Sequence, residues 1–266
     1  IMDRGVGQIA QTLDELALRD DTILMFTSDN GPAFNLRPDQ VPEGMDTNTL
    51  RYNCGFNGQK GSVYEGGIRV PMIMNWPGGL EGGRRVDDLV HATDWLPTLA
   101  NICGVERPGG RPLDGCDALP ILRGSGAEAP ARFWQLNAQQ PVGWINAAMR
   151  AGPWKLVRPR LAEKPQSDAD QRLMDRYVEM DIRYKYHPDE VTTLMDDQDP
   201  QLITPPPIAP ELYNIEHDPE EKNNLAESEA EQTSRMLGAL QDWFDGVEAE
   251  RRRIQPDGSI VELANE

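Results

Sequence analysis

The sequence predicts an α/β fold in two parts, residues 1–126 and residues 127–266. In the first part, segments with helical periodicity alternate with short continuous apolar runs, a pattern typical of strands covered by helices. In the second part, short strand-like segments are separated by turn residues, as in an antiparallel sheet. A final amphipathic helix, with Leu240 and Trp243 on its apolar face, is expected to pack on that sheet.

The first part is expected to contain two helices and two strands, in the order helix 2–16, strand 22–27, strand 70–76 and helix 93–103. Consecutive apolar residues in each strand predict burial on both faces, as in a parallel sheet. Thr93 or Asp94 is expected to start the second helix, and Gly104 suits the position after its end.

The second part is expected to contain four short strands, at residues 133–136, 147–150, 154–157 and 211–214. Ser167 and Asp170 lie three residues apart, as do the two residues of the capping box at a helix N-terminus. They predict a helical insertion near residues 167–187, before the last strand.

Composition excludes several classes of protein. The net charge is −18, with 44 acidic against 26 basic residues, which argues against nucleic-acid binding. A site for an anionic substrate therefore needs local cations or a metal. A membrane span requires about 20 consecutive apolar residues, and every apolar run in this sequence is much shorter. The three cysteines lack metal-ligand spacing and are expected to be free thiols, although one disulfide involving Cys116 is an alternative.

Asp29 and Asn30 directly follow the first predicted strand, in the sequence S-D-N-G. Ligands of α/β sheets bind at the carboxyl ends of strands, and a carboxylate beside an amide oxygen suits a hard cation such as Ca²⁺. The alternative is a tight turn, because Asn and Gly accept positive φ.

Lys60 lies among four glycines in residues 57–69, which we call the glycine-rich turn. A lysine held by such backbone can place a positive charge on an oxyanion. The alternative is an irregular turn with a solvated lysine, and no Walker A pattern is present. Glu65 and Arg69 are expected to hold the turn by hydrogen bonds.

These motifs resemble a known family when they are taken in order. S-D-N-G is followed by G-x-K-G-x-x-x-E-G-G-I-R-V-P and by an apolar strand ending in W-P-G. Further along the chain come D-x-x-P-T-L at 94–99, R-P-L-D-G at 111–115, W-K-L at 154–156, E-L-Y-N at 211–214 and D-P-E-E-K-N-N-L-A at 218–226. This order, over nearly the whole chain, resembles the formylglycine-dependent sulfatases of the alkaline phosphatase superfamily.

The resemblance implies the second half of an alkaline-phosphatase-like sheet-and-helix domain, followed by a smaller antiparallel sheet with a C-terminal helix. It implies a calcium-dependent sulfuric ester hydrolase that releases inorganic sulfate from a small-molecule or carbohydrate sulfate ester. Asp29 and Asn30 correspond to calcium ligands, and Lys60 corresponds to a catalytic cation that contacts the sulfate. A periplasmic or extracellular location is expected by the same resemblance.

Other parts of the family's site have no counterpart in this sequence. No C-x-P-S-R or S-x-P-S-R motif occurs, so the formylglycine is expected upstream of Ile1 and the chain alone is expected to be inactive. Two alternatives remain open. One is a two-metal phosphatase or phosphonate hydrolase, whose relatives tend to have Asp-His at the strand end. The other is a non-catalytic C-terminal module.

Residues 31–58 form a long Pro- and Gly-rich segment between the predicted metal residues and Lys60. The segment is expected to fold over the site, with Arg51 and Tyr52 on the leaving-group side of the pocket. Trp134 or Trp144 is expected to join them. The alternative is a surface loop ordered by its own turns.

Overall fold

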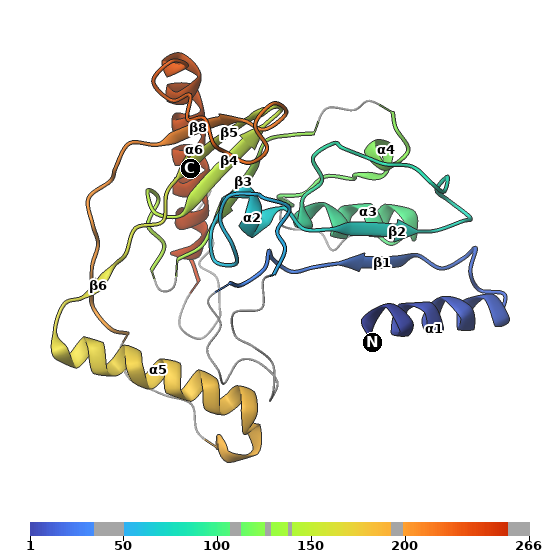
Figure 1. The fold of residues 1–266 in the computed structure, drawn as a ribbon, viewed down its shortest axis with the longest axis horizontal. Coiled ribbons are helices and arrows are strands. Elements are labelled where there is room, and N and C mark those ends of the chain that lie inside the picture. The colour runs from blue at the N-terminus through green and yellow to red at the C-terminus, as the bar shows by residue number, and fades with distance from the viewer. Residues whose placement is uncertain (35–50, 107–112, 126–128, 138–139, 193–198, 255–266) are drawn as a thin grey trace.

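Figure 1 shows the fold as a computed structural model. The structure describes residues 1–34, 51–106, 113–125, 129–137, 140–192 and 199–254. Most of the predicted loop 31–58 lies outside these residues, as does the predicted boundary at residue 126. The first part contains α1 (Met2–Glu15), β1 (Leu24–Thr27), α2 (Glu65–Ile68), β2 (Met72–Asn75), the 3-10 turn η2 (Ala92–Asp94), α3 (Trp95–Ile102) and α4 (Leu119–Leu122).

Strands β1 and β2 pair antiparallel, with Phe26 opposite Ile73, so the expectation of a parallel arrangement is wrong. The reason lies in the glycine-rich turn, which directly precedes β2. Its backbone is hydrogen-bonded to the residues that follow β1, so β2 begins where β1 ends and runs back beside it. The expected burial on both faces is also wrong: no residue of either strand is buried, and Ile73 is 62% exposed.

Helix α3 is preceded by η2, in which the His91 ring accepts a hydrogen bond from Thr93 N and the Asp94 carboxylate accepts one from His91 N. This reciprocal cap starts the helical segment slightly earlier than expected. After α3, Gly104 has a φ of +63°, the left-handed conformation expected of the residue that ends a helix.

The second part contains the predicted antiparallel sheet. Its strands are β3 (Arg132–Gln135), β4 (Ala147–Ala151), β5 (Trp154–Arg158) and β8 (Glu211–Asn214), paired in that order. Helix α6 (Ala230–Arg251) packs on one face of this sheet (Figure 1). The core between them is made of apolar side chains from β4, β5, β8 and α6, namely Ala147, Met149, Leu156, Leu212, Met236 and Leu240.

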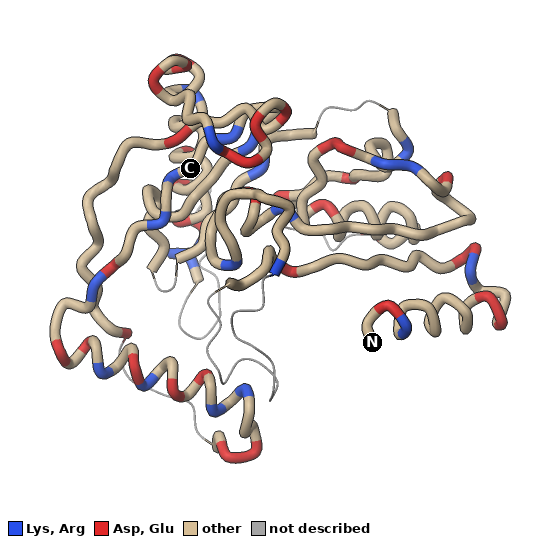
Figure 2. Tube along the Cα trace, viewed as in Figure 1, with Lys and Arg blue, Asp and Glu red and all other residues tan. Residues whose placement is uncertain are grey.

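Helix α5 (Asp168–Tyr186) lies where the sequence predicts a helix, between β6 (Lys164–Pro165) and β7 (Leu202–Ile203). The Ser167 hydroxyl accepts a hydrogen bond from Asp170 N and caps its start. The helix has no buried residue and carries charges of both signs along its length (Figure 2). None of the helices in the described part of the chain combines the length and hydropathy of a bilayer span.

The opposite face of the sheet holds the glycine-rich turn. Val63 packs there against Ala148, Val157 and other buried residues. Asn146, just before β4, accepts a hydrogen bond from Val63 N (3.2 Å) and donates one to Gly61 O (3.1 Å). The turn is thus fixed to the sheet by apolar packing and by backbone hydrogen bonds together.

A buried ion-pair cluster, formed by Lys155, Glu65 and Glu221, completes this attachment. Lys155 Nζ on β5 lies 2.8 Å from Glu65 Oε1, at the start of α2, and 2.8 Å from Glu221 Oε1, after β8. The pair with Glu65 is aligned as a hydrogen bond, whereas no described donor is aligned with Glu221 Oε1. Glu221 Oε2 accepts a hydrogen bond from Glu65 N at 2.7 Å. A buried lysine requires such partners, because an unpaired charge in the interior is strongly unfavourable.

We expect Lys155→Met to lower the free energy of unfolding by about 3–5 kcal/mol, because it leaves two buried carboxylates without their cation. Urea unfolding followed by circular dichroism measures the change. Lys164→Met, at an exposed lysine on β6, is the control and should have little effect. Replacing Glu65 and Glu221 by Gln in the Lys155→Met protein should recover part of the loss. Equal stability of the two methionine variants would contradict this account.

Candidate functional site

The glycine-rich turn meets the end of β1 through close backbone contacts. Gly31 N donates to Gly67 O and Lys60 N donates to Pro32 O, both at 2.9 Å. A Cβ atom at Gly31 would lie 1.8 Å from Gly66 O, so this approach requires glycine. The two motifs that the sequence singles out, S-D-N-G and G-x-K-G, therefore lie side by side.

A pocket of about 1780 Å³ lies at this junction. Asp29, Asn30 and Lys60 line it from the first part, and Trp134 and Arg150 line it from β3 and β4. Additional cations in the wall are Arg69, Arg84 and Arg85. The lining also holds acidic side chains, namely Asp29, Glu65, Glu81, Asp87, Asp88 and Glu216. A site for an anion therefore depends on the lining cations that have no ion-pair partner among the described residues, such as Lys60 and Arg150.

Asp29 and Asn30 have oxygens that could bind a cation. The Asn30 side-chain amide donates to Gly31 O at 2.9 Å, which leaves its carbonyl oxygen without a hydrogen bond from any described residue. Asp29 is exposed, and its carboxylate likewise has no described partner. One charged and one neutral oxygen ligand fit a hard cation such as Ca²⁺. No group of three or more His, Cys, Asp or Glu residues that could hold a metal occurs in the described ranges.

Lys60 is exposed and makes no ion pair with a described residue, so its charge is available to a ligand. Its position is set by the turn on both sides. Phe34 N donates to the Gln59 side chain at 2.9 Å, and Asn146 of the C-terminal sheet donates to Gly61 O. The backbone around the lysine is therefore held by the end of β1 and by the sheet at the same time.

Of the four residues predicted to contact the leaving group, one lines the pocket. Trp134 lines the pocket and its indole contacts the His91 ring edge-on, with centroids 5.0 Å apart. Trp144 instead donates from its indole nitrogen to Pro205 O at 3.1 Å. Arg51 and Tyr52 are exposed and do not occur among the described residues that line the pocket. Their role in substrate binding stays a prediction.

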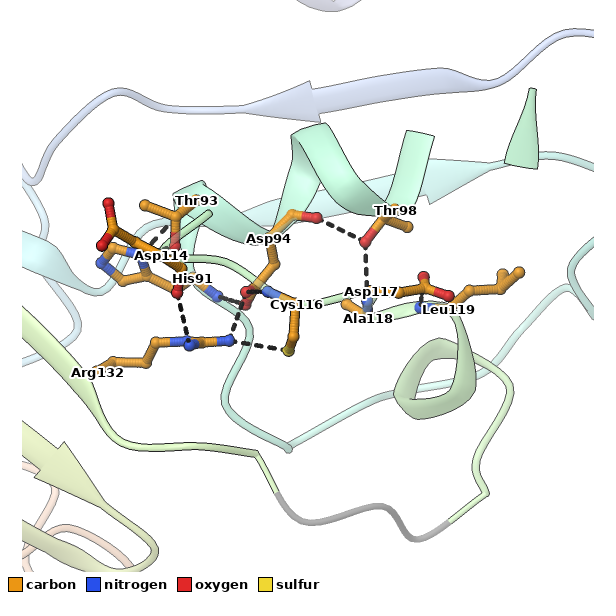
Figure 3. A network of polar contacts seen from close by, with 10 residues as sticks. All are labelled: His91, Thr93, Asp94, Thr98, Asp114, Cys116, Asp117, Ala118, Leu119 and Arg132. Carbon is orange, nitrogen blue, oxygen red and sulfur yellow. Dashed lines mark hydrogen bonds and ion pairs between the residues drawn. The ribbon is translucent and has the colours of Figure 1, made fainter. Parts of the chain in front are cut away.

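A second buried network joins α3 to the sheet (Figure 3). Asp94 Oδ1 accepts hydrogen bonds from Cys116 N at 2.9 Å and from the Arg132 guanidinium, while Oδ2 accepts one from His91 N. Arg132 also donates to Cys116 Sγ at 3.1 Å. Cys54, Cys103 and Cys116 are all free thiols, as expected. This network fixes His91, and with it the wall of the pocket beside Trp134.

Sequence reasoning expected Glu65 to hold the glycine-rich turn but missed its partners in the buried cluster, Lys155 and Glu221. Lys155 occurs in the motif W-K-L, and a lysine within an apolar strand is a signal for a buried ion pair. Glu221 had no such signal, because it lies in an acidic, exposed-looking segment. Its φ of +55° lies in the left-handed region, which residues other than glycine seldom adopt.

Two family profiles match the chain. The Sulfatase profile matches residues 1–105, and the C-terminal profile of N-sulphoglucosamine sulphohydrolase matches residues 55–158. Steryl-sulfatase of Mus musculus is 39% identical over 150 residues, which are 55% of this chain and 23% of that protein. An N-acetylgalactosamine-6-O-sulfatase of Bacteroides thetaiotaomicron is 28% identical over 231 residues, which are 86% of this chain and 38% of that protein.

The solved structures that resemble this fold also include sulfatases. One from work on glycosaminoglycan metabolism by Bacteroides thetaiotaomicron has a TM-score of 0.58 at 26% identity, covering 93% of this chain and 43% of the other. A sulfatase from Pseudoalteromonas sp. has a TM-score of 0.53 at 21% identity, covering 88% of this chain and 39% of the other. The protein therefore has the alkaline-phosphatase-like α/β fold of solved sulfatases, as predicted. Residues 1–158 thus resemble sulfatases in sequence, and the chain spans less than half the length of these relatives.

The stability of the Lys155 cluster should depend on pH. Burial raises the pKa of Glu221 above its usual 4.5, and the neighbouring Glu65 carboxylate adds to the effect, although Lys155 opposes it. The folded state then keeps a proton that the unfolded state releases above pH 4.5. The resulting stability is fully present below the unfolded pKa and is lost as pH rises through the folded pKa.

We therefore expect the difference in unfolding free energy between the natural protein and Glu221→Gln to fall as pH rises above 4.5. Urea unfolding at a series of pH values measures both proteins under the same conditions, so carboxylates common to both cancel. A difference that stays constant, or grows with pH, would show that the Glu221 pKa is not raised.

Proposed function

We propose that this chain supplies part of the active site of a calcium-dependent sulfatase, which releases inorganic sulfate from a sulfate ester. One observation carries the proposal: Asp29, Asn30 and Lys60 line one pocket, where hydrogen bonds between the end of β1 and the glycine-rich turn bring them together. The similarity of residues 1–158 to sulfatases supports the same reaction. The carbohydrate named for the Bacteroides relative favours a sugar sulfate as the substrate.

In this proposal, each residue of the chain has a separate task. Asp29 and Asn30 hold the cation through their side-chain oxygens, and a bound Ca²⁺ would offset the negative charge of the sulfate oxygens. The Lys60 ammonium donates hydrogen bonds to the sulfate or to the ester oxygen, on which charge develops as the S–O bond breaks. The nucleophile is expected from residues outside this sequence, because neither C-x-P-S-R nor S-x-P-S-R occurs in it.

The alternatives are less well supported. A two-metal phosphatase or phosphonate hydrolase tends to have histidine beside the strand-end aspartate, whereas this chain has Asn30. A non-catalytic module gives no role to Lys60 and Arg150, which line one pocket and have no ion-pair partner among the described residues. We therefore keep sulfate-ester hydrolysis as the proposed reaction and a periplasmic or extracellular location as a prediction.

The metal proposal has a direct test. We expect the 266-residue chain to bind Ca²⁺ with a dissociation constant of about 1 mM or weaker, because two side chains fall short of the six to eight oxygens that Ca²⁺ takes. Terbium luminescence or calorimetry measures it. Asp29→Asn should abolish the signal, whereas Asp87→Asn, at an exposed carboxylate paired with Arg85, should not. Binding that ignores Asp29 would remove the metal assignment.

The catalytic proposal predicts two activities. The chain alone should hydrolyse no aryl sulfate. In a protein that joins it to a segment carrying the C-x-P-S-R motif, Lys60→Ala should lower kcat by about 10²-fold, which is typical of removing one group that stabilises transition-state charge. Release of nitrophenol from nitrophenyl sulfate measures both. Turnover by the chain alone, or full activity of the Lys60→Ala protein, would contradict the proposed roles.

A further inference from the structure

A row of three cations crosses the C-terminal sheet on the face that holds the glycine-rich turn. Arg132 on β3 lies directly opposite Arg150 on β4, and Arg150 lies opposite Lys155 on β5. Directly opposed like charges on neighbouring strands destabilise a sheet. Each cation in such a row is therefore expected to have an anionic partner.

The two outer cations have partners within the protein. Arg132 is 4% exposed and pairs with Asp94. Lys155 is fully buried and pairs with Glu65 and Glu221. These carboxylates come from three different segments, so the fold devotes considerable long-range structure to neutralising the two ends of the row.

Arg150, the middle cation, has no such partner. It makes no ion pair within 4.0 Å among the described residues, and the hydrogen bond of its side chain, from Nε to Gly152 O, is long at 3.4 Å. The charged groups that act on it electrostatically are Glu65, Arg69 and Glu216. Glu65 is already paired with Lys155 and with Arg69, which is itself a second positive charge. Burial lowers the pKa of Arg150, but a guanidinium remains charged in a protein.

The position of Arg150 gives this charge a use. Its side chain is partly buried and lines the same pocket as Lys60 and Trp134. The pocket, at about 1780 Å³, exceeds the 300–1,000 Å³ of a site for a single small ligand. It therefore has room for a substrate with groups beyond the sulfate at Lys60. Arginine suits a sulfate or carboxylate particularly well, because its planar fork donates two parallel hydrogen bonds.

We propose that Arg150 binds a second anionic group of the substrate, at a subsite of the pocket separate from Lys60. The proposal rests on the proposed function and narrows the substrate class to sulfated carbohydrates that carry a further sulfate or a carboxylate. Arg69 lines the same pocket but is paired with Glu65 at 3.4 Å, so the subsite rests on Arg150. Trp134, on β3 in the same pocket wall, offers an aromatic surface to the sugar between the two anionic groups.

Calorimetric titration of the 266-residue chain at constant ionic strength tests the subsite. Three disaccharides serve as probes: one with two sulfates, one with a sulfate and a carboxylate, and one with a single sulfate and no other charge. Arg150→Gln should weaken binding of at least one doubly charged probe about tenfold or more, because charge-assisted hydrogen bonds are lost. The affected probe identifies the second group as sulfate or carboxylate. Binding of the singly charged probe should change less than about twofold.

Arg158→Gln is the matched control. Arg158 lies on neighbouring β5 and is partly buried, and burial lowers its pKa as well, but it does not line the pocket. If both variants weaken binding equally, or if Arg150→Gln weakens all three probes alike, binding reflects net charge and the subsite is wrong. Unchanged binding of both doubly charged probes to Arg150→Gln also overturns it.

A measurement on the natural protein removes dependence on the variant's folding. The NMR signal of Arg150 Nε–H should shift on titration with a doubly charged probe and hardly shift with the singly charged one. An unshifted Arg150 signal at saturation contradicts the proposal. If the proposed function is wrong but the subsite is right, the Lys60→Ala protein keeps full activity while the Arg150 signal still shifts.

Discussion

A single buried lysine holds the structure around the site together. Lys155 lies on a strand of the C-terminal sheet, yet its charge is balanced by Glu65, which is 90 residues away in sequence, and by Glu221. Glu65 begins the short helix that ends the glycine-rich turn. Because burying an unpaired ammonium or carboxylate is strongly unfavourable, these three segments can only reach a stable arrangement together. The location of Lys60 is thus set by a sheet to which it does not belong.

The same electrostatic logic extends across the sheet and into the pocket. A chain with a net charge of −18 repels anions at long range, so an anion site needs cations whose charge is not spent on internal pairs. The ends of the cation row serve the fold, because Asp94 and the Glu65–Glu221 pair neutralise them. Lys60 and Arg150 remain available on the pocket wall. This division between structural and available cations separates residues that build the site from residues that contact a ligand.

Much of this architecture could be predicted from the sequence, and the failures have a common cause. Periodicity located α1, α3, α5 and α6, and the turn residues correctly divided the C-terminal strands. The motifs also indicated that Asp29, Asn30 and Lys60 belong to one site. The predicted direction of β2 relative to β1 was wrong, because an apolar run contains no information about which strand pairs with it. Lys155 and Glu221 were missed for the same reason: their importance depends on contacts between distant segments, which local patterns do not record.

The central claim is that the glycine-rich turn belongs to the same cooperative unit as the C-terminal sheet. Native-state hydrogen exchange tests it directly, because residues of one unit open with the same free energy. The amides of Val63 and Glu65, which donate to Asn146 and Glu221, are expected to show the same opening free energy as Leu156 in β5. Much easier opening of the two turn amides, with Leu156 still protected, would show that the turn moves independently of the sheet and would contradict the account.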